Sequence, residues 1–496
     1  MPARILLLIF LCACSDPMPG RKLASGIAQR LTVAPGAVAF LIDAGHPDDR
    51  SVPDDLLAGD LWLGALESGA AQKIASGVSS APGSFGFSAR GEEVAVLASW
   101  RFRSGAGELW TAAPGQAAQQ LAKEASSFAW SPTEPALAFV APGRLGIRKA
   151  GGHEAVSVAI DGLHDVAWSP DGRHVAARAA ASAGGKLWLV DASSGAKSEI
   201  APGTSDFAFA PDGALAALGP PPPKGGDRPL LLGGHELARA TAFAFSPDGQ
   251  RLALLSTAKQ PGEATGELSL LPRAGGEAKP VGQKAGDWRF GPSGELFFLG
   301  RYDLRARAGT LTVVSPGGVA REIAPKVQGF VAEKERVLYL VQAPQKGDFK
   351  IELWEAALSG ASAPRKIDEG VYGWQLTPDG RTLLYKARCA GGPRSCSALR
   401  LALGTPDAKP EFLAANVAGF DLSQDGARLL LQQPHRGATR AVDLSVISVQ
   451  GPPPQKIRPL VEEVDASSRF ADPAGRRVVY AVIAASKGGV YVADVP

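Results

Sequence analysis

The sequence of 496 residues has little net charge and no long apolar run in its interior. Its 52 lysines and arginines nearly balance 49 aspartates and glutamates, so the formal net charge is only +3. Binding to nucleic acid through phosphates requires a basic surface, which this balance does not predict. Beyond residue 13, no stretch approaches the roughly 20 apolar residues that span a bilayer. We therefore expect no nucleic-acid partner and no membrane-spanning segment in the body of the chain.

Motifs that carry catalysis are also missing. A serine hydrolase would need Gly-x-Ser-x-Gly at a nucleophile elbow, and the nearest match, Gly86-Phe-Ser-Ala-Arg90, lacks the second glycine. None of the six histidines has the spacing of a zinc motif, and no glycine pair precedes the Lys-Ser and helix of a phosphate loop. We predict no catalytic residues and no cofactor.

What the chain has in abundance is glycine and proline, with 59 and 39 copies. Hydrophobic residues make up 45% of the sequence, enough for a sizeable core, and aromatic residues only 7%. This composition favours many short strands joined by turns.

The first residues have the parts of a secretory signal. Arg4 is followed by the short apolar run from Ile5 to Leu11 and then by small residues. The segment Leu11-Cys-Ala-Cys14 resembles the lipobox of bacterial lipoproteins, in which the last cysteine is lipidated and becomes the new N-terminus. An ordinary cleaved signal with incidental cysteines is the alternative.

The lipobox resemblance implies a signal peptide over residues 1–13, lipidation of Cys14 and a short tether over residues 14–28. In that family an aspartate directly after the lipidated cysteine retains the protein at the inner membrane. Here Ser15 holds that position, which implies an outer-membrane lipoprotein of the bacterial cell envelope, facing the periplasm or the cell surface.

Two further cysteines, Cys389 and Cys396, flank a Gly-Pro turn at the ends of two expected strands. In an oxidising compartment this spacing predicts a disulfide across a hairpin. A metal site is the competing interpretation, but two thiols without a nearby histidine do not complete a tetrahedral shell.

A repeat of about 42 residues runs along the whole chain from residue 29 to 496. Its clearest copies are Phe243-Ala-Phe-Ser-Pro-Asp-Gly249 and Val166-Ala-Trp-Ser-Pro-Asp-Gly172. Eleven anchors, each the residue before the proline position, fall near residues 34, 88, 131, 169, 210, 246, 291, 332, 377, 423 and 472. The copies near Ala34 and Ala332 are degenerate.

Each copy predicts a hairpin. Aromatic residues at alternate positions form one short strand, and proline, aspartate and glycine form the turn that follows it. An apolar strand, a third strand such as Gly185–Val190 and a fourth, outer strand complete the unit. Four strands per 40-odd residues is the blade of a β-propeller.

The Ser-Pro-Asp-Gly motif in blades of this length resembles the TolB-type, WD-like β-propeller family. We therefore expect an all-β propeller of about eleven four-stranded blades. Because eleven exceeds the usual number in one ring, we favour two smaller rings in tandem over one wide ring. We also expect the strand at Ile27–Val33 to complete the last blade and so close the ring.

Three loops are candidates for function. Two combine arginine with aromatic residues, as interface hot spots do, although blade-edge loops have the same composition. They contain Trp100, Arg101, Phe102, Arg103, Arg301, Tyr302 and Arg305. The third, between Ile42 and Leu61, could offer calcium ligands or be an ordinary solvated loop. Its aspartates are Asp43, Asp48, Asp49, Asp54, Asp55 and Asp60.

The resemblance to TolB-type proteins implies a lipid-anchored module that binds a protein partner in the envelope. The alternative is an enzyme or a receptor that uses the central channel for a small ligand such as a sugar or a peptide.

Overall fold

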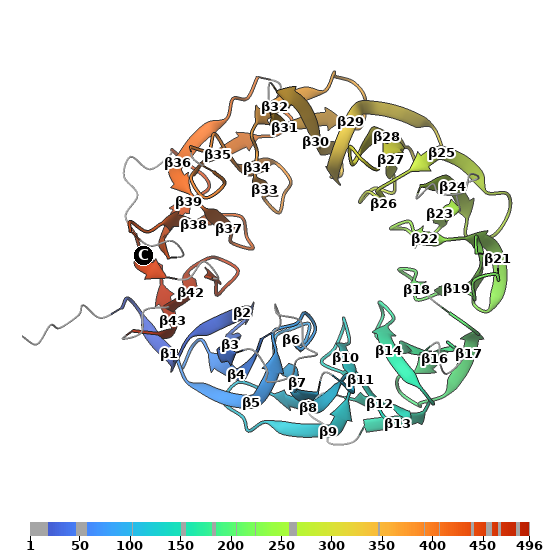
Figure 1. The fold of residues 1–496 in the computed structure, drawn as a ribbon, viewed down its shortest axis with the longest axis horizontal. Coiled ribbons are helices and arrows are strands. Elements are labelled where there is room, and N and C mark those ends of the chain that lie inside the picture. The colour runs from blue at the N-terminus through green and yellow to red at the C-terminus, as the bar shows by residue number, and fades with distance from the viewer. Residues whose placement is uncertain are drawn as a thin grey trace, which may run out of the picture.

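The structure is a computed structural model. It describes residues 18–45, 57–101, 103–149, 155–180, 185–204, 206–223, 225–256, 265–345, 348–390, 392–405, 407–437, 441–452, 459–464, 468–482 and 487–495. The predicted signal peptide over residues 1–13 and the predicted lipidation site Cys14 lie outside these residues. Every regular element in the described part is a β-strand, and the strands form radial sheets around a central axis (Figure 1).

The first six blades each contain four antiparallel strands in chain order from the inside of the ring to the outside. Blade 1 contains β2 (Ala28–Ala34), β3 (Ala37–Gly45), β4 (Ala58–Ala65) and β5 (Ala71–Ser79). Blade 2 contains β6 (Phe85–Phe87), β7 (Val94–Arg101), β8 (Ala106–Ala112) and β9 (Gln119–Ala125). Blade 3 contains β10 (Ser127–Trp130), β11 (Leu137–Ala141), β12 (Arg144–Arg148) and β13 (Ala155–Ala159). Blade 4 contains β14 (Leu163–Trp168), β15 (His174–Ala179), β16 (Leu187–Asp191) and β17 (Lys197–Ala201). Blade 5 contains β18 (Asp206–Phe209), β19 (Leu215–Leu218), β20 (Arg228–Leu232) and β21 (His235–Ala240). Blade 6 contains β22 (Ala242–Phe245), β23 (Arg251–Ser256), β24 (Gly266–Pro272) and β25 (Lys279–Ala285).

The remaining five blades include one shared strand and one strand from the opposite end of the chain. Blade 7 contains β26 (Trp288–Phe290), β27 (Leu296–Asp303), β28 (Ala308–Val314) and the first half of β29 (Ala320–Ala332). Blade 8 contains the second half of β29 with β30 (Arg336–Gln345), β31 (Asp348–Ala357) and β32 (Arg365–Glu369). Blade 9 contains β33 (Gly373–Leu376), β34 (Thr382–Ala387), β35 (Cys396–Ala402) and β36 (Glu411–Val417). Blade 10 contains β37 (Gly419–Leu422), β38 (Arg428–Pro434), β39 (Val442–Ser448) and β40 (Val461–Val464). Blade 11 contains β41 (Arg469–Phe470), β42 (Arg477–Val482), β43 (Gly489–Asp494) and, as its outer strand, β1 (Arg21–Ser25).

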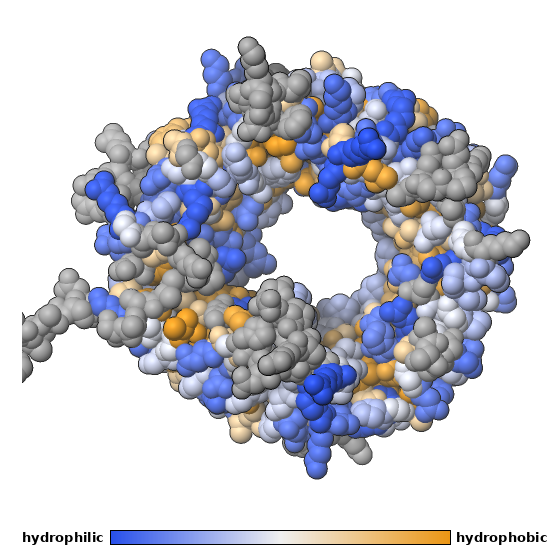
Figure 2. Space-filling view, viewed as in Figure 1, coloured by the Kyte–Doolittle hydropathy of each residue, from blue (hydrophilic) through white to orange (hydrophobic). Residues whose placement is uncertain are grey.

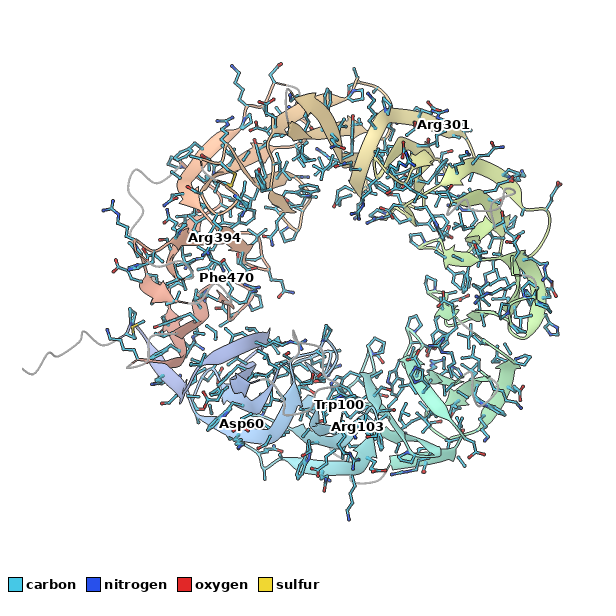
Figure 3. The ribbon with its side chains drawn as sticks, viewed as in Figure 1. Asp60, Trp100, Arg103, Arg301, Arg394 and Phe470 are labelled. Atoms are coloured by element: carbon cyan, nitrogen blue, oxygen red, sulfur yellow. A yellow bond between two sulfur atoms is a disulfide. The ribbon has the colours of Figure 1, made fainter. Side chains whose placement is uncertain are left out.

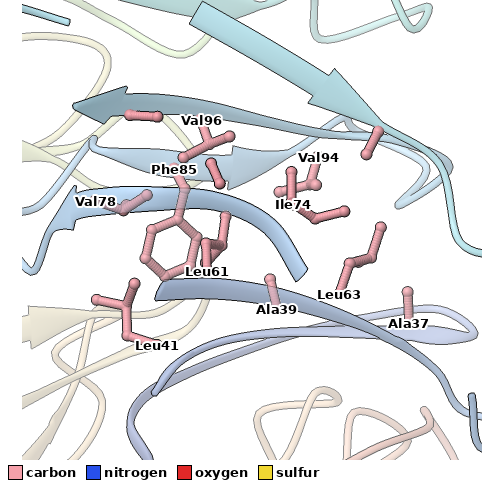
Figure 4. Close-up of a cluster of buried hydrophobic side chains, with 13 residues drawn as sticks. Ala37, Ala39, Leu41, Leu61, Leu63, Ile74, Val78, Phe85, Val94 and Val96 are labelled. Carbon is pink, nitrogen blue, oxygen red and sulfur yellow. The ribbon is translucent and has the colours of Figure 1, made fainter. Parts of the chain in front are cut away.

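Each blade buries both faces of its sheet, and this explains the apolar runs of the second strands. In β34, Leu383 and Tyr385 pack toward blade 8, while Leu384 between them packs toward blade 10. Alternation along a strand thus supplies two interfaces at once. Figure 4 shows such an interface between blades 1 and 2, where Leu41 and Leu61 pack near Phe85.

The interfaces show that the protein is one ring. Eleven buried hydrophobic clusters occur in the described part of the chain, and each joins two successive blades. One cluster joins blade 11 to blade 1 through residues such as Val479 and Phe40. The expected all-β propeller of eleven blades is confirmed. The preference for two tandem rings is wrong, because no interface is interrupted where a smaller ring would have to close (Figure 1).

The strand that closes the ring is not the one expected. β1 pairs with β43 in antiparallel register, with Arg21 opposite Val492. The expected closing segment, Ile27–Val33, overlaps β2, which instead forms the first hairpin of blade 1 with β3 around Pro35-Gly36. The anchor near Ala34 marks a hairpin turn, so the strand before it belongs to the same blade. The propeller therefore begins at about residue 21 rather than 29, so β1 occupies residues that were expected to form a tether.

The turns between first and second strands fall at the eleven predicted anchors. In blade 4, the Ser169 hydroxyl donates a hydrogen bond to the Asp171 carboxylate (2.6 Å) and accepts one from the His174 amide (2.9 Å). The amide of Arg173 donates to the same carboxylate at 3.0 Å, and Gly172 has a φ of 71°. The serine bond, followed by the amide bond, holds the pKa of Asp171 below its ordinary value. The same arrangement recurs in three other blades, at Ser246 and Asp248, at Thr377 and Asp379, and at Ser423 and Asp425.

These turns also contact one another around the ring. A β-carbon on Gly426 of blade 10 would lie 2.6 Å from the ring of Pro378 in the turn of blade 9. A β-carbon on Gly249 of blade 6 would lie 3.2 Å from the ring of Pro211 in blade 5. At these two positions the glycine of the motif therefore meets two requirements, a positive φ and close approach to the preceding blade.

Candidate binding surfaces

The antiparallel blades give the ring two unlike faces. The turns between first and second strands and between third and fourth strands lie on one side, which we call the turn face. The connections between second and third strands, together with the links from blade to blade, lie on the other side, the loop face. Six of the eleven connections between second and third strands have seven or more residues, whereas every turn between first and second strands has six or fewer. Length variation of this kind is typical of loops that carry function.

The two arginine-aromatic loops occupy equivalent positions on the loop face of blades 2 and 7. A bulge precedes Arg101, which pairs with Ala106, and an equivalent bulge precedes Asp303, which pairs with Ala308. Trp100 folds back onto the cluster between blades 2 and 3, and Tyr302 onto the cluster between blades 7 and 8. The rings of Trp100 and Tyr302 are therefore partly buried in interfaces between blades.

The arginines of these loops are exposed. Arg101 forms an ion pair with Glu124 (2.7 Å) and Arg301 one with Glu322 (2.6 Å), while Arg103 and Arg305 are exposed. Phe102 lies outside the described residues. Figure 3 shows that Trp100 and Arg103 lie across the ring from Arg301, so the structure does not bring the two loops together. A single partner would have to span the central opening to contact both.

Only two aspartates of the acidic loop fall within the described residues, and both have partners in this chain. The Asp43 carboxylate accepts a hydrogen bond from the Ile27 amide (3.1 Å), and Asp60 forms an ion pair with Lys73 (2.7 Å). Asp48, Asp49, Asp54 and Asp55 lie outside the described part. Within that part, no group of three or more histidines, cysteines or carboxylates gathers as metal ligands would.

The predicted disulfide between Cys389 and Cys396 is present and closes the loop between β34 and β35 on the loop face of blade 9. The Lys386 ammonium bonds to the Pro393 carbonyl inside this loop (3.3 Å) and to the Ala418 carbonyl at the start of blade 10. Burial lowers the pKa of Lys386. The loop is thus tied to the ring at both its cysteines and this lysine, and its Arg394 is exposed. Figure 3 labels Arg394 on this part of the ring.

A cavity of about 600 Å³ opens on the turn face between blades 8 and 9. Its lining includes Lys334, Arg336, Glu355, Ser359, Arg365 and Thr405. A second hollow of about 350 Å³ shares Lys334 and Arg336 and reaches Asp379 of blade 9. Cavities of this size are typical of sites for small ligands.

Glu355 lines the larger cavity and forms ion pairs with two arginines that line it too. Its side chain is 10% exposed and pairs with Arg336 (2.9 Å) and Arg365 (2.7 Å). The amide of Gly404 donates to the same carboxylate at 3.3 Å, and Arg365 donates to the Thr405 carbonyl at 3.0 Å. One buried carboxylate between two guanidinium groups therefore connects blade 8 to the turn of blade 9.

Sequence reasoning did not find this site, although a signal was present. The cavity lies where the repeat loses its motif, because Ala332-Glu-Lys-Glu335 replaces Ser-Pro-Asp-Gly. The hollow beside Pro35, of about 200 Å³, lies at the other degenerate repeat and includes Asp421 and Asp472. The two repeats that lack the motif, near Ala332 and Ala34, therefore mark the positions of these two hollows.

The centre of the ring is open, as Figure 2 shows, and the innermost strands form its wall. On β37 in this wall, burial raises the pKa of Asp421, while Arg469 and the Phe470 amide act in the opposite direction. The Phe470 amide donates to its carboxylate at 3.4 Å.

One closed ring of four-stranded antiparallel blades defines a β-propeller. No family model matches the sequence, and no curated protein matches it. Solved structures similar to it include a eukaryotic initiation factor, with 12% identity over 68% of this chain and 88% of that chain (TM-score 0.41). Dipeptidyl peptidase 4 of Porphyromonas gingivalis shows 12% identity over 84% of this chain and 65% of that one (TM-score 0.39). The β-propeller domain of the Trilobed protease from Pyrococcus furiosus shows 14% identity over 69% and 98% (TM-score 0.31). The fold assignment rests on the blades themselves.

No helix in the described residues is long and apolar enough to cross a bilayer.

Proposed function

We propose that this chain is a lipid-anchored β-propeller of the bacterial envelope that binds a protein partner, as the TolB-type resemblance implies. The observation that carries the proposal is the contrast between the two faces: short, uniform first turns on one side and long, varied connections on the other. Rigid scaffolds that present variable loops on one face are suited to binding. The lipobox-like segment Leu11–Cys14, with Ser15 after it, supports lipidation at Cys14 and the outer membrane as the location.

The loop face also exposes apolar surface. Five large hydrophobic side chains are exposed in the described part, and three of them lie on this face. They are Ile27 (50%), Leu304 (55%) and Tyr372 (57%). Leu304 lies between Arg301 and Arg305 in blade 7, and Tyr372 lies in the link between blades 8 and 9. We therefore place the partner's contact on the loop face of blades 7 to 9, where apolar and arginine side chains occur together.

Site-specific photo-cross-linking tests this assignment. A cross-linker at Leu304 or Tyr372 should give a discrete adduct with one protein in intact cells, and one at Val319, an exposed apolar residue on the turn face, should not. Equal labelling from both faces would contradict a dedicated loop-face interface. Membrane association is tested separately, since Cys14→Ser should release the protein from membranes.

The cavity between blades 8 and 9 supports a second candidate, a receptor for a small ligand. Its three cations, two carboxylates and hydroxyl groups suit a polar ligand that carries a carboxylate, such as a short peptide. A ligand from a panel of peptides and sugars should raise the melting temperature of the protein. The shift should disappear in Ser362→Trp, which fills the cavity, and no shift with any member would argue against this candidate.

A further inference from the structure

The chain is fixed to the outer rim of blade 11 from its first described residue. Met18 packs with Leu460 and Val495 against the cluster between blades 10 and 11. The Tyr480 hydroxyl donates a hydrogen bond to the Pro19 carbonyl, and Gly20, with a φ of 88°, lies against Ala493 of β43. The N-terminus therefore leaves the ring at one defined place on its circumference, where Figure 1 draws β1 beside β43.

The direction of β1 decides which face this place adjoins. Arg21 lies opposite Val492, near the end of β43, and Ser25 lies opposite Gly489, at its beginning. The Val495 amide donates to the Arg476 carbonyl (2.7 Å) in the turn that joins β41 and β42. The N-terminal end of β1 therefore points toward the turn face, and the connection from Ser25 to Ala28 lies on the loop face.

Few residues separate this exit from the lipidation site. Only Ser15, Asp16 and Pro17 lie between Cys14 and Met18. Since an extended residue spans at most about 3.6 Å, the lipidated cysteine stays within about 15 Å of Met18. A lipid inserted in the bilayer would thus hold the rim of blade 11 close to the headgroups.

We propose that the outer rim of blades 10, 11 and 1, at the edge of the turn face, rests against the membrane surface and that the loop face is directed away from it. The inference depends on the lipidation proposed above. Charges at this rim are mixed, with Arg21, Lys22 and Arg476 near Glu67 and Asp494. The short tether, rather than attraction to anionic lipid, sets the orientation.

Fluorescence quenching in proteoliposomes tests this orientation on the full lipidated chain. Three exposed residues are replaced by cysteine, one at a time, and labelled: Ser68, Ile27 and Ala274. Ser68 lies on the turn face of blade 1, Ile27 on the loop face between blades 11 and 1, and Ala274 on the turn face of blade 6, across the ring. With a quencher attached to lipid headgroups, quenching should be strongest for Ser68→Cys and weakest for Ala274→Cys.

Equal quenching at the three positions, or strongest quenching for Ile27→Cys, would overturn the orientation while leaving the anchor in place. Failure of the wild-type chain to associate with vesicles would overturn the anchor itself, and with it the orientation. A matched variant with a flexible glycine-serine segment inserted after Asp16 should still associate but lose the difference between positions. If that variant keeps the difference, the short tether is not what orients the ring.

Discussion

Arg21 of β1 lies opposite Val492 of β43, so the two ends of the chain share one antiparallel strand pair. Leu23 and Ala24 of the same short strand are buried in the cluster between blades 11 and 1. The ring is thus closed both by backbone hydrogen bonds and by apolar packing.

Deleting residues 18–25 should lower the melting temperature and promote association, because β43 becomes an exposed edge. Within the strand, Leu23→Ala should destabilise the protein by about 2–5 kcal/mol, as expected for a buried leucine. Lys22→Ala, at the exposed neighbouring position, is the control and should change stability by less than about 0.5 kcal/mol. Calorimetry and size-exclusion chromatography measure both effects, and an unchanged melting temperature in the deletion would contradict the closing role of β1.

The contact between turns of neighbouring blades predicts unequal costs for two glycine substitutions. Gly426 has a φ of 75° and lies against Pro378, whereas Gly143 has a φ of 70° and a β-carbon added there would meet nothing within 4 Å. Gly143→Ala should cost about 1–2 kcal/mol for the left-handed conformation alone. Gly426→Ala should cost more, since the turns of blades 9 and 10 must also separate. Equal losses in urea unfolding would show that the approach of the turns contributes nothing.

Two aspartates of blade 10 should show opposite dependence on pH. Burial raises the pKa of Asp421 above its ordinary value of 3.8, so the folded state binds this proton more tightly than the unfolded state. The resulting stabilisation is complete below pH 3.8 and is lost as the pH rises through the folded-state pKa. Asp421→Asn should therefore be more stable than wild type at neutral pH and lose that advantage in acid.

Asp425 provides the contrast, because the Ser423 hydroxyl, the Ala427 amide and Arg428 lower its pKa. Its stabilisation is present above pH 3.8 and is lost as the pH falls through the lowered value. Asp425→Asn should be less stable than wild type at neutral pH, with the difference shrinking in acid. Unfolding free energies of wild type and both variants, measured from pH 3 to 7, give the pH dependence of each stability difference. If both differences change with pH in the same direction, the opposite pKa shifts of Asp421 and Asp425 are refuted.

Removing the carboxylate that joins blades 8 and 9 should be costly. Glu355→Gln leaves Arg336 and Arg365 without their buried counter-ion, and the expected loss is about 3–5 kcal/mol. Glu335→Gln is the control, since that side chain is 84% exposed and its 3.8 Å pair with Arg336 contributes little. Comparable losses in the two variants, measured by chemical denaturation, would mean that burial of Glu355 is not the source of the effect.

The features that could be predicted from sequence are local. Each Ser-Pro-Asp-Gly turn is held by bonds within five residues, as between Ser169 and His174, so eleven copies predicted eleven blades. The disulfide between Cys389 and Cys396 spans a single hairpin, so it could also be predicted from the sequence. The number of rings depends instead on the angle between packed blades, which no single repeat encodes.

Other features depend on residues that are distant in sequence. Arg21–Ser25 begins with two basic residues and has only two buried residues, Leu23 and Ala24. From its sequence alone it resembles a tether, and only its pairing with β43 identifies it as a strand. Arg336, Glu355 and Arg365 come from three strands and meet only in the folded blade. The aromatic residues of the predicted binding loops, Trp100 and Tyr302, pack between blades, and their composition alone did not distinguish this packing from exposure.

The position of β1 has a mechanical consequence. Tension applied at the N-terminus reaches the ring through Met18 and Pro19 and then through the pair of Arg21 with Val492. The load enters at the Arg21 end of this pair, so a force directed away from β43 would break its bonds one after another, as in unzipping. The strand that closes the ring is therefore also the first part to detach when the chain is pulled, and the other ten blades bear that load only after it has gone.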